Sequence, residues 1–470
     1  MKNYSMAWRN LWRNKRRTLI TVASVLFAVF FALVMRSLQL GTYDHMFRNV
    51  IESYSGYLQI QHENFPDTKT IDNLLKYTPE LEMEILKDEN AVAVIPRLES
   101  FALASSGNLT KGVLVMGVDP GKEAYLTDIR ERLVKFRLDE NNIDNLKKSQ
   151  LPDKYKERLD QFKGRSFSSK QAIMLDLGIS DKDSAEIMPV IRQHTSILNG
   201  FISMGETGAL VGDRLASFLK VSTGDTLVLL GQGYHGTTAA GKYRIKGIVR
   251  MPTPDFDNKI VYLPVDACQE LYNAQGMLSS LVICIKENSN RDIDRMITSM
   301  GSKLYAPLKA VSWKEMNELL INQIEADSKS GMVMIAILYL VIAFGIFGTV
   351  LMMTAERRRE FGVLVAIGMQ KTKLASIVAF EMLYIGLMGV LSGSMVALPV
   401  IIFGYYSPIR FSGEMAKMYE DYGMEPVMPF LPVDWYFLWQ SVVVAIIVLI
   451  AVIYPVRKIT RMQVVNSLKA

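Results

Sequence analysis

The sequence has few of the side chains that metal or thiol chemistry requires. It contains two cysteines and four histidines in 470 residues. No metal-binding spacing links the histidines, which are His45, His62, His194 and His235. Cys268 and Cys284 could form a disulfide, but a domain of this size does not depend on one, so we expect two small buried side chains. Because nucleophile-elbow, HExxH and paired-cysteine motifs are also missing, we expect no catalysis by this chain.

A complete ATP-binding motif is missing as well. Residues 236–242 spell GxxxxGK, but Tyr243 stands where a phosphate-binding loop has the Ser or Thr that holds magnesium. Such a loop also joins a strand to a helix, whereas strands are expected on both sides here. We therefore expect no cofactor in this chain, and we interpret 231–242 as a flexible, Gly-rich hairpin tip. Its candidate contact residues for a substrate or partner are Gly233, Tyr234, His235, Gly236 and Thr237.

Long hydrophobic runs, by contrast, are present. A transmembrane helix needs about 20 apolar residues. We predict four such helices, over 18–40, 331–355, 374–404 and 435–455. The acid within these runs is Glu381, which lies about eight residues beyond Lys373 and roughly 12 Å into the bilayer by helix rise. An acid at this depth is expected to bond a neighbouring helix or to face a polar cleft.

Lys and Arg concentrate on one side of these helices. Segments 1–17, 356–373 and 456–470 hold 15 Lys and Arg and 2 Asp and Glu, whereas the rest of the chain holds 38 and 45. Basic residues mark the cytosolic side of a membrane. Both termini are therefore expected in the cytosol, and the large segment 41–311 outside. Because the high isoelectric point follows from this topology, we do not expect nucleic-acid binding.

Residues 4–16 of the N-terminal segment are predicted to form a helix that lies in the membrane interface. One face of this helix carries Tyr4, Trp8, Leu11 and Trp12, and the opposite face carries arginines. An aromatic face with a basic back suits the headgroup layer of a bilayer.

Segment 41–311 has the short alternating runs of a mixed α/β domain. The expected strands are 56–61, 112–118, 225–230, 243–249, 259–263 and 281–286. The expected helices are about 72–89, 213–220, 265–274 and 289–300. Residues 131–170 are rich in charge and poor in apolar residues, which indicates an insertion or a mobile subdomain.

A stalk helix is predicted over 312–330. Ser312 and Glu315 form a capping-box pattern, and an apolar face follows without a breaker into the second membrane run. A continuous rod of this kind could transmit motion between the membrane and the outer domain.

A compact charged element, 356–373, joins the second and third membrane runs. Three successive arginines lie between Glu356 and Glu360, and Gly362 and Gly368 are expected to form turns. The element lies on the predicted cytosolic side, where a cytosolic partner could push on it.

Small residues in the membrane runs predict close helix packing. The candidates are Gly345, Gly348, Gly389 and Gly393. Packing within one subunit and packing between subunits are both consistent with them. Residues 405–434 form an outside loop that is long enough to make contacts with a partner.

Residues 356–381 resemble the signature that follows the second membrane helix in ABC permeases of the MacB, LolC/LolE and FtsX type. The matching residues are Glu356 to Gly362, Ala366 to Gly368, and Glu381. Other blocks resemble further parts of the same family, in the same order along the chain. They are Ala7 to Arg17, Gly117 to Pro120, Gly208 to Thr226, and Tyr454 to Lys458 with Ser467 and Leu468.

The resemblance implies a type VII, or mechanotransmission, permease in a bacterial inner membrane. Such a protein has four transmembrane helices and a two-lobed periplasmic α/β domain. Two permeases, identical or different, pair above a separate ATPase dimer that binds ATP and magnesium, and ATP-driven closure passes through the stalk to the outer domain. The residues that would dock on the ATPase are Glu356, Arg357, Arg358, Glu360, Gly362, Ala366, Gly368 and Met369.

Two features favour the lipoprotein-releasing branch of this family, namely the hairpin at 231–242 and the sizeable loop at 405–434. This branch extracts lipoproteins from the outer leaflet, and lipid tails enter between helix one of one subunit and helix two of the other. Its hairpin, which docks a periplasmic chaperone, has proline where this chain has Gly and Thr. Two alternatives stay open: MacB-like efflux of peptides or drugs with a periplasmic adaptor, and FtsX-like regulation of a wall hydrolase or sensor kinase.

The predicted topology can be tested with a single cysteine placed within 236–240. Because this hairpin is expected outside the membrane, an impermeant thiol reagent should label the cysteine in intact spheroplasts. Labelling that occurs only after the cells are lysed would show that the orientation is wrong.

Overall fold

The structure is a computed structural model that describes residues 3–13, 15–65, 70–301, 303–421 and 424–461. The chain forms two compact units. The membrane unit comprises Met1–His45, Leu320–Arg410 and Val427–Ala470. The outer unit comprises Met46–Leu319 and Phe411–Pro426.

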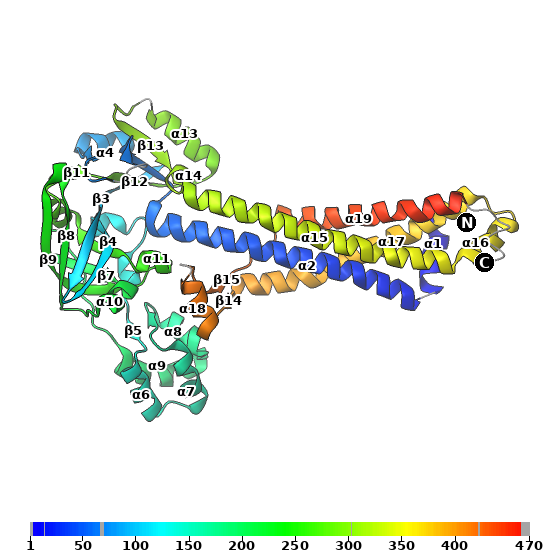
Figure 1. Ribbon diagram of the computed structural model, residues 1–470, viewed down its shortest axis with the longest axis horizontal. Helices are drawn as coiled ribbons and strands as arrows, with labels where there is room; N and C mark the ends of the chain where they lie inside the picture. The colour runs from blue at the N-terminus through cyan, green and yellow to red at the C-terminus, as the bar shows by residue number, and fades with distance from the viewer. Residues whose placement is uncertain (1–2, 14, 66–69, 302, 422–423, 462–470) are drawn as a thin grey trace. The chain divides into compact units, whose positions relative to one another are not determined.

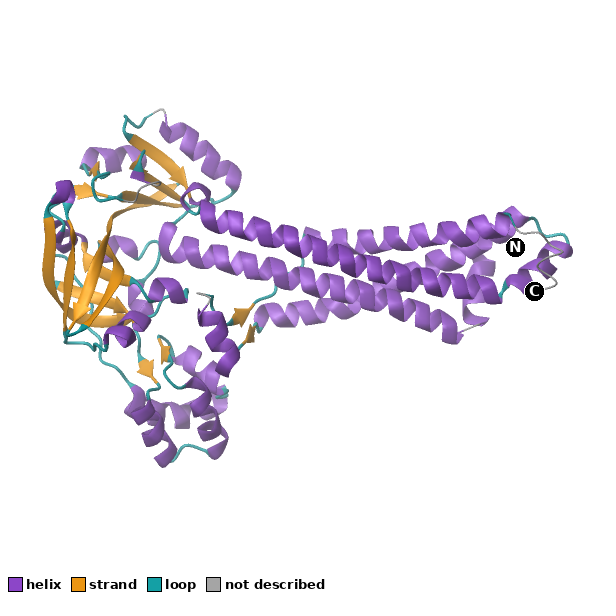
Figure 2. Cartoon of the chain, in the orientation of Figure 1, coloured by secondary structure: helices purple, strands orange, loops and turns teal. Residues whose placement is uncertain are grey.

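Four helices within the described residues are long and apolar enough to cross a membrane (Figures 1 and 2). They are α2 (Lys15–Val50), α15 (Glu318–Glu356), α17 (Lys371–Tyr406) and α19 (Trp435–Thr460). A helix suits these apolar runs because it bonds every backbone polar group internally, as a bilayer requires. The four predicted membrane helices are therefore confirmed, and each extends beyond its apolar run.

Glycines let α17 pack closely on its neighbours. A Cβ on Gly389 would lie 2.4 Å from Cβ of Val25 in α2, and one on Gly393 would lie 2.7 Å from the Leu26 carbonyl oxygen. These two glycines therefore serve packing within one chain. In α15, a Cβ on Gly345 or Gly348 would meet no atom of the described chain within 4 Å, so neither glycine serves a close approach there.

The predicted N-terminal helix is α1 (Asn3–Arg13). Ala7 and Leu11 are buried, and the Trp8 ring lies 5.5 Å from that of Tyr384 in α17. Trp8 and Trp12 keep nearly half of their surface exposed. The helix therefore packs on the membrane unit through one face, and its indole rings stay partly exposed.

The outer unit is built on a nine-stranded sheet, here called the sheet lobe together with its helices. Its strands are β1 (Leu58–His62), β3 (Ala91–Ser106), β4 (Leu109–Val118), β7 (Gly208–Gly212), β8 (Thr226–Gln232), β9 (Thr238–Val249), β10 (Ile260–Pro264), β12 (Ser280–Ile285) and β13 (Leu308–Ser312). The helices of this lobe are α4 (Pro79–Ile85), α5 (Pro120–Glu123), α10 (Asp213–Leu219), α11 (Pro254–Asp257), α12 (Val265–Leu271), α13 (Asn290–Gly301) and α14 (Trp313–Met316). The predicted mixed α/β domain is thus confirmed.

Strand β3 organises this sheet. One edge pairs with β4, while the other pairs first with β12, over 91–97, and then with β8, over 102–105. Because β8 continues through β9, β7 and β10 back to β4, six strands close into a ring and the remaining three extend from it. The two halves of β3 therefore serve two sheet segments, and a strand of 16 residues is required.

A helical lobe, residues 136–195, forms a second core in the outer unit. It contains α6 (Glu140–Lys148), α7 (Asp153–Leu159), α8 (Lys170–Leu177) and α9 (Asp181–Thr195), together with the pair β5 (Phe136–Arg137) and β6 (Ser166–Phe167). Leu138, Leu146, Leu159, Ile173 and Ile191 are completely buried in it. The sequence predicts an insertion or a mobile subdomain with few apolar anchors at 131–170, and the structure corrects the scarcity of anchors. The apolar residues of this segment recur at helical spacing, and α8 and α9 beyond residue 170 complete the core.

Two other expectations differ from the structure. The expected helix at 72–89 is only α4, preceded by the short strand β2 (Leu75–Lys76), which pairs with β11 (Met277–Leu278). The predicted continuous stalk is interrupted: Ser312 caps α14 through the Glu315 amide, but Asn317 leaves helical geometry before α15 begins. The stalk therefore has a joint of one residue.

The loop between α17 and α19 contains β14 (Ile409–Arg410), α18 (Gly413–Asp421) and β15 (Val427–Met428). The two short strands pair with each other. Most of the predicted cytosolic tail, together with the matching residues Ser467 and Leu468, lies outside the described residues.

Candidate functional site

The charged element between the second and third membrane helices forms a separate short helix, α16 (Arg358–Ala366). Just beyond the helix the chain turns at Gly368, whose φ of +106° is a conformation that side-chain-bearing residues rarely adopt. The Met369 amide donates to the Leu364 carbonyl across this end. Gly368 is thus the expected turn. Gly362 is not, because it lies buried in the middle of the helix.

An ion pair fixes the start of α16. Arg357 Nη1 donates to Glu381 Oε2 of α17 at 2.6 Å, and the Glu381 side chain is 2% exposed. The Arg357 guanidinium also lies over the Phe361 ring, at 5.1 Å from its centroid. Glu381, the acid of the third membrane run, therefore bonds the arginine at the corner between α15 and α16.

A second carboxylate connects the same corner to the N-terminal helix. Glu360 Oε2 accepts from Arg13 Nη2 at 2.7 Å and from Arg357 Nε at 3.4 Å. Both Arg13 and Glu360 are more than half exposed, so this contact contributes at most about 1 kcal/mol. It orients α1 and α16 rather than stabilising the fold.

The remaining surface of α16 combines arginines with exposed apolar side chains. Arg358 and Arg359 are exposed, and so are Val363 (41%), Leu364 (36%) and Ile367 (79%). We call these five residues the α16 face. Of the other predicted coupling residues, Glu356 and Ala366 are exposed and Met369 is half-buried. An apolar patch beside cations is typical of a protein–protein docking surface.

The predicted contact residues at 233–237 form the turn between β8 and β9. His235 has a φ of +51° and Gly236 one of +76°, and both are exposed. The Tyr234 amide donates to the Tyr272 carbonyl at 2.8 Å, and the His235 amide to Asp72 Oδ1 at 2.9 Å. The hairpin tip is therefore held against the end of α12 rather than projecting freely.

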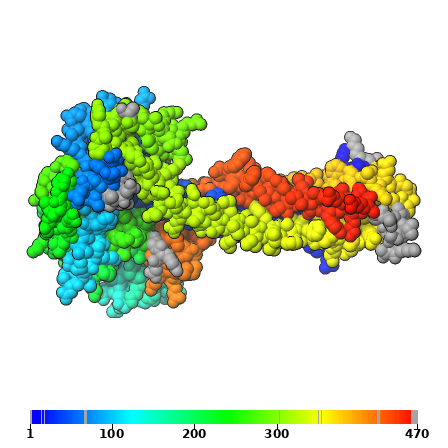
Figure 3. Space-filling model, turned by 45° about the horizontal axis from the view of Figure 1, so that its top comes forward, coloured from blue at the N-terminus to red at the C-terminus, as the bar shows by residue number. Residues whose placement is uncertain are grey.

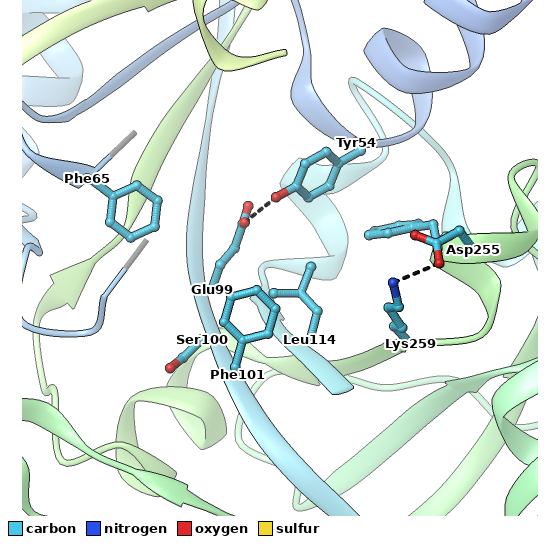
Figure 4. A pocket seen from close by; sticks show the side chains of 9 residues that line it. Tyr54, Phe65, Glu99, Ser100, Phe101, Leu114, Asp255 and Lys259 are labelled. Atoms are coloured by element: carbon cyan, nitrogen blue, oxygen red, sulfur yellow. Dashed lines mark hydrogen bonds and ion pairs between the residues drawn. The ribbon is translucent and has the colours of Figure 1, made fainter. Parts of the chain in front are cut away.

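A cavity of about 190 Å3 lies in the outer unit beside β3 and α11 (Figure 4). Its lining includes the rings of Tyr54, Phe65, Phe101 and Phe256. The Tyr54 hydroxyl donates to Glu99 Oε2 at 2.6 Å, and Lys259 pairs with Asp255 at 2.7 Å on the other side of the view. The cavity is mainly aromatic, with one buried carboxylate fixed by a tyrosine.

A fully buried ion pair lies next to Glu99 in the same strand. Arg97 donates to both carboxylate oxygens of Glu123 at the end of α5, with Nε to Oε2 at 3.1 Å. Arg97 also donates to the Tyr54 carbonyl. A bidentate contact of this kind offsets much of the free-energy cost of removing both charges from water. Sequence reasoning missed this pair, because no spacing along the chain relates residues 97 and 123.

Neither cysteine forms a disulfide. Cys268 is buried against Gly117, and Cys284 in β12 is partly exposed. Burial raises the pKa of both thiols, that of Cys284 to about 11, so both are protonated at neutral pH. In the described ranges, no group of three or more His, Cys, Asp or Glu side chains has a metal-binding arrangement.

Comparison with known families bears on the membrane unit. The family model for the FtsX-like permease C-terminal domain matches residues 332–464, which include most of α15 and all of α16, α17 and α19. The C-terminal part of this chain is an FtsX-like permease domain. The resemblance to FtsX-type permeases read from residues 356–381 is thereby confirmed.

A curated relative is similar to part of the chain. An uncharacterized ABC transporter permease of Methanocaldococcus jannaschii, MJ1507, is 27% identical over 160 residues, or 32% of this chain. The chain spans 39% of the length of that curated relative.

Two solved structures are similar to part of the chain. The periplasmic region of MacB from Actinobacillus actinomycetemcomitans is matched over 98% of its length and 59% of this chain, at 10% identity and a TM-score of 0.30. The extracellular domain of YknZ from Gram-positive bacteria is matched over 100% of its length and 55% of this chain, at 10% identity and a TM-score of 0.28. Scores this low support no argument about this chain.

The Arg357–Glu381 pair can be tested by unfolding. Arg357→Ala leaves a carboxylate buried without its guanidinium, which should cost about 3–5 kcal/mol. Arg357→Met combined with Glu381→Leu removes both charges and should cost much less. The melting temperature of the purified chain in detergent measures this difference, and equal losses in the two variants would contradict the assignment.

Proposed function

We propose that this chain is the transmembrane subunit of an ABC transporter, and that α16 receives the force of ATP hydrolysis from a separate ATPase dimer. The α16 face carries this proposal. In the cytosol its exposed isoleucine, leucine and valine would be costly without a partner, and the arginines beside them favour an acidic groove. The FtsX-like match over the same residues supports it.

The ion pair at the corner would make α16 an efficient receiver of force. A push on the α16 face acts on Arg357, which is bonded to Glu381 of α17 and directly follows Glu356, the last residue of α15. Motion of α16 therefore reaches two membrane helices at once. Helix α15 runs as 39 residues without a proline, so it can carry the motion as a rod up to the joint at Asn317.

The arrangement in the membrane follows from the charge distribution. We propose an inner-membrane protein with both termini and α16 in the cytosol, and with the outer unit on the opposite side. A second permease, identical or different, would complete the complex. The face of α15 around Gly345 and Gly348 includes exposed side chains such as Ile337, Val341 and Phe344, which suits a membrane interface between subunits.

For the substrate, we propose lipoproteins or similar amphiphiles that are extracted from the membrane. The support is the size of the loop between α17 and α19, together with the hairpin between β8 and β9. A docking role for the hairpin tip has less support, because the tip is bonded to Tyr272 and Asp72. MacB-like efflux and FtsX-like regulation of a hydrolase or kinase are the competing functions.

Glu360→Lys tests the role of α16. The substitution places a third cation beside Arg13 and Arg357, and it should uncouple ATP hydrolysis from movement of the outer unit while the fold stays intact. The measurements are the ATPase rate of the purified complex and the protease sensitivity of residues 46–319, each with and without ATP. Normal ATP-dependent movement in this variant would contradict the coupling role.

A charge exchange supplies the control. Arg13→Glu combined with Glu360→Lys restores an ion pair between α1 and α16 with the signs reversed. If the defect of Glu360→Lys arises from a lost docking contact, the double variant should stay uncoupled. Full recovery would instead show that the Arg13–Glu360 pair alone is responsible.

Purification of the native complex followed by mass spectrometry separates the three functions. We expect an ATPase and a lipoprotein to be retained with the permease. A wall hydrolase or a sensor kinase in place of the lipoprotein would favour regulation, and a periplasmic adaptor would favour efflux. A complex without any ATPase would contradict the proposed function as a whole.

A further inference from the structure

Helix α18 belongs to the outer unit, although the residues on both sides of its segment belong to the membrane unit. Residues 411–426 leave the membrane unit after β14 and return to it at β15, so they are covalently joined to α17 and α19. Any movement of these two membrane helices is therefore passed to both ends of this segment. What α18 contacts in the outer unit decides where that movement is delivered.

One carboxylate of α18 contacts both lobes of the outer unit. Glu420 Oε2 accepts from Arg214 Nη2 in α10 of the sheet lobe, and Glu420 Oε1 lies 3.7 Å from Arg165 Nη2 in the helical lobe. The Glu420 side chain is 16% exposed, so solvent screens these contacts only partly. Figures 1 and 3 both show α18 beside the helical lobe.

The helical lobe holds the side chain of Arg165, and the sheet lobe holds the backbone of Arg214. Arg165, which precedes β6, donates to Asp176 of α8 at 2.8 Å. The amide of Arg214 donates to Asp257 Oδ2 at 3.0 Å, which fixes the start of α10. Burial, with the neighbouring Asp213, raises the pKa of Asp257 to about 6, and at neutral pH it remains an acceptor. Glu420 therefore contacts one arginine whose guanidinium is fixed by its own lobe, Arg165, and one whose backbone is fixed at the start of a helix, Arg214.

Apart from this contact, α18 is held weakly. Ala416 is its buried apolar residue, whereas Met415 and Met418 are nearly half exposed. No described residue of α18 takes part in an apolar core cluster of the outer unit. A polar cleft of about 1050 Å3, lined by both lobes and by α18, lies beside the ion pairs. Besides Glu420, Glu425 of the same segment accepts from Asn49 Nδ2 at 3.2 Å, so Glu420 is the contact that ties α18 itself to both lobes.

We infer that Glu420 is a positioning residue that couples the loop between α17 and α19 to the helical lobe. Through it, movement of these membrane helices pulls on Arg165 and Arg214 and changes the angle between the two lobes. This route is separate from the stalk formed by α14 and α15, which reaches the sheet lobe through β13. The inference rests on the proposed function, since it assumes that the membrane helices move with ATP.

The first test is hydrogen–deuterium exchange on the full chain in complex with its ATPase, without nucleotide. It asks whether the contacts of Glu420 hold α18 in place. Glu420→Gln removes the charge and keeps the shape of the side chain. The amides of residues 413–421 should then exchange about tenfold faster, because charge-assisted contacts hold this helix. Glu414→Gln is the matched control on the same helix: Glu414 is exposed and has no ion-pair partner among the described residues, so its effect should stay below about twofold.

The same complex trapped with ATP and vanadate tests the coupling. In the wild-type complex, trapping should change exchange at residues 164–177 of the helical lobe and at residues 308–316, which form β13 and the α14 part of the stalk. In Glu420→Gln the change at 164–177 should be lost, while the change at 308–316 persists. Arg214→Gln should reproduce this result, and the double variant should add little, because both substitutions break one contact.

The outcomes separate the two proposals. A helical lobe that still responds fully to trapping in Glu420→Gln overturns the coupling role of Glu420 and leaves the proposed function intact. A wild-type complex in which no part of the outer unit responds overturns the proposed function. If Glu414→Gln and Glu420→Gln accelerate amide exchange in α18 equally without nucleotide, then the contacts of Glu420 do not hold this helix in place.

Discussion

The buried pair of Arg357 and Glu381 is the contact on which the membrane unit depends. A carboxylate in an apolar helix bundle is tolerated only if a cation reaches it, and the cation here comes from the first residue after α15. This requirement fixes where α15 ends and how α16 leaves it. It also holds α16, a short helix of mixed character, firmly at the corner between α15 and α17.

Polar contacts rather than apolar cores hold α18 and the hairpin tip in the outer unit. Each lobe has its own buried core, whereas α18 is held through Glu420 and the hairpin tip through two backbone amides. Ion pairs and single hydrogen bonds can be broken and re-formed with little change in buried apolar area. A domain held together by such contacts can change shape at them while the apolar core of each lobe stays packed.

Hydrophobicity and local geometry made much of the architecture predictable. The four membrane helices follow from run length, because a bilayer demands internal backbone bonding whatever the neighbours are. Ser312 at the start of α14 and Gly368 at the end of α16 follow from capping and from positive φ. Long-range pairing and packing were not predictable. The sequence did not predict β3, whose length is set by pairing with both β12 and β8, and the helical lobe needs residues beyond 170 to close its core.

The candidate site was only partly visible in the sequence. The sequence by itself determined the topology class, the position of the charged element and the resemblance at residues 356–381, because these depend on composition and on short spacings. Only the tertiary structure decided that Arg357 bonds Glu381, that Gly389 and Gly393 pack against α2, and that Glu420 bridges Arg165 and Arg214. Each of these contacts joins residues far apart in the chain or on different helices. Their formation is decided by packing in three dimensions, which no local pattern encodes.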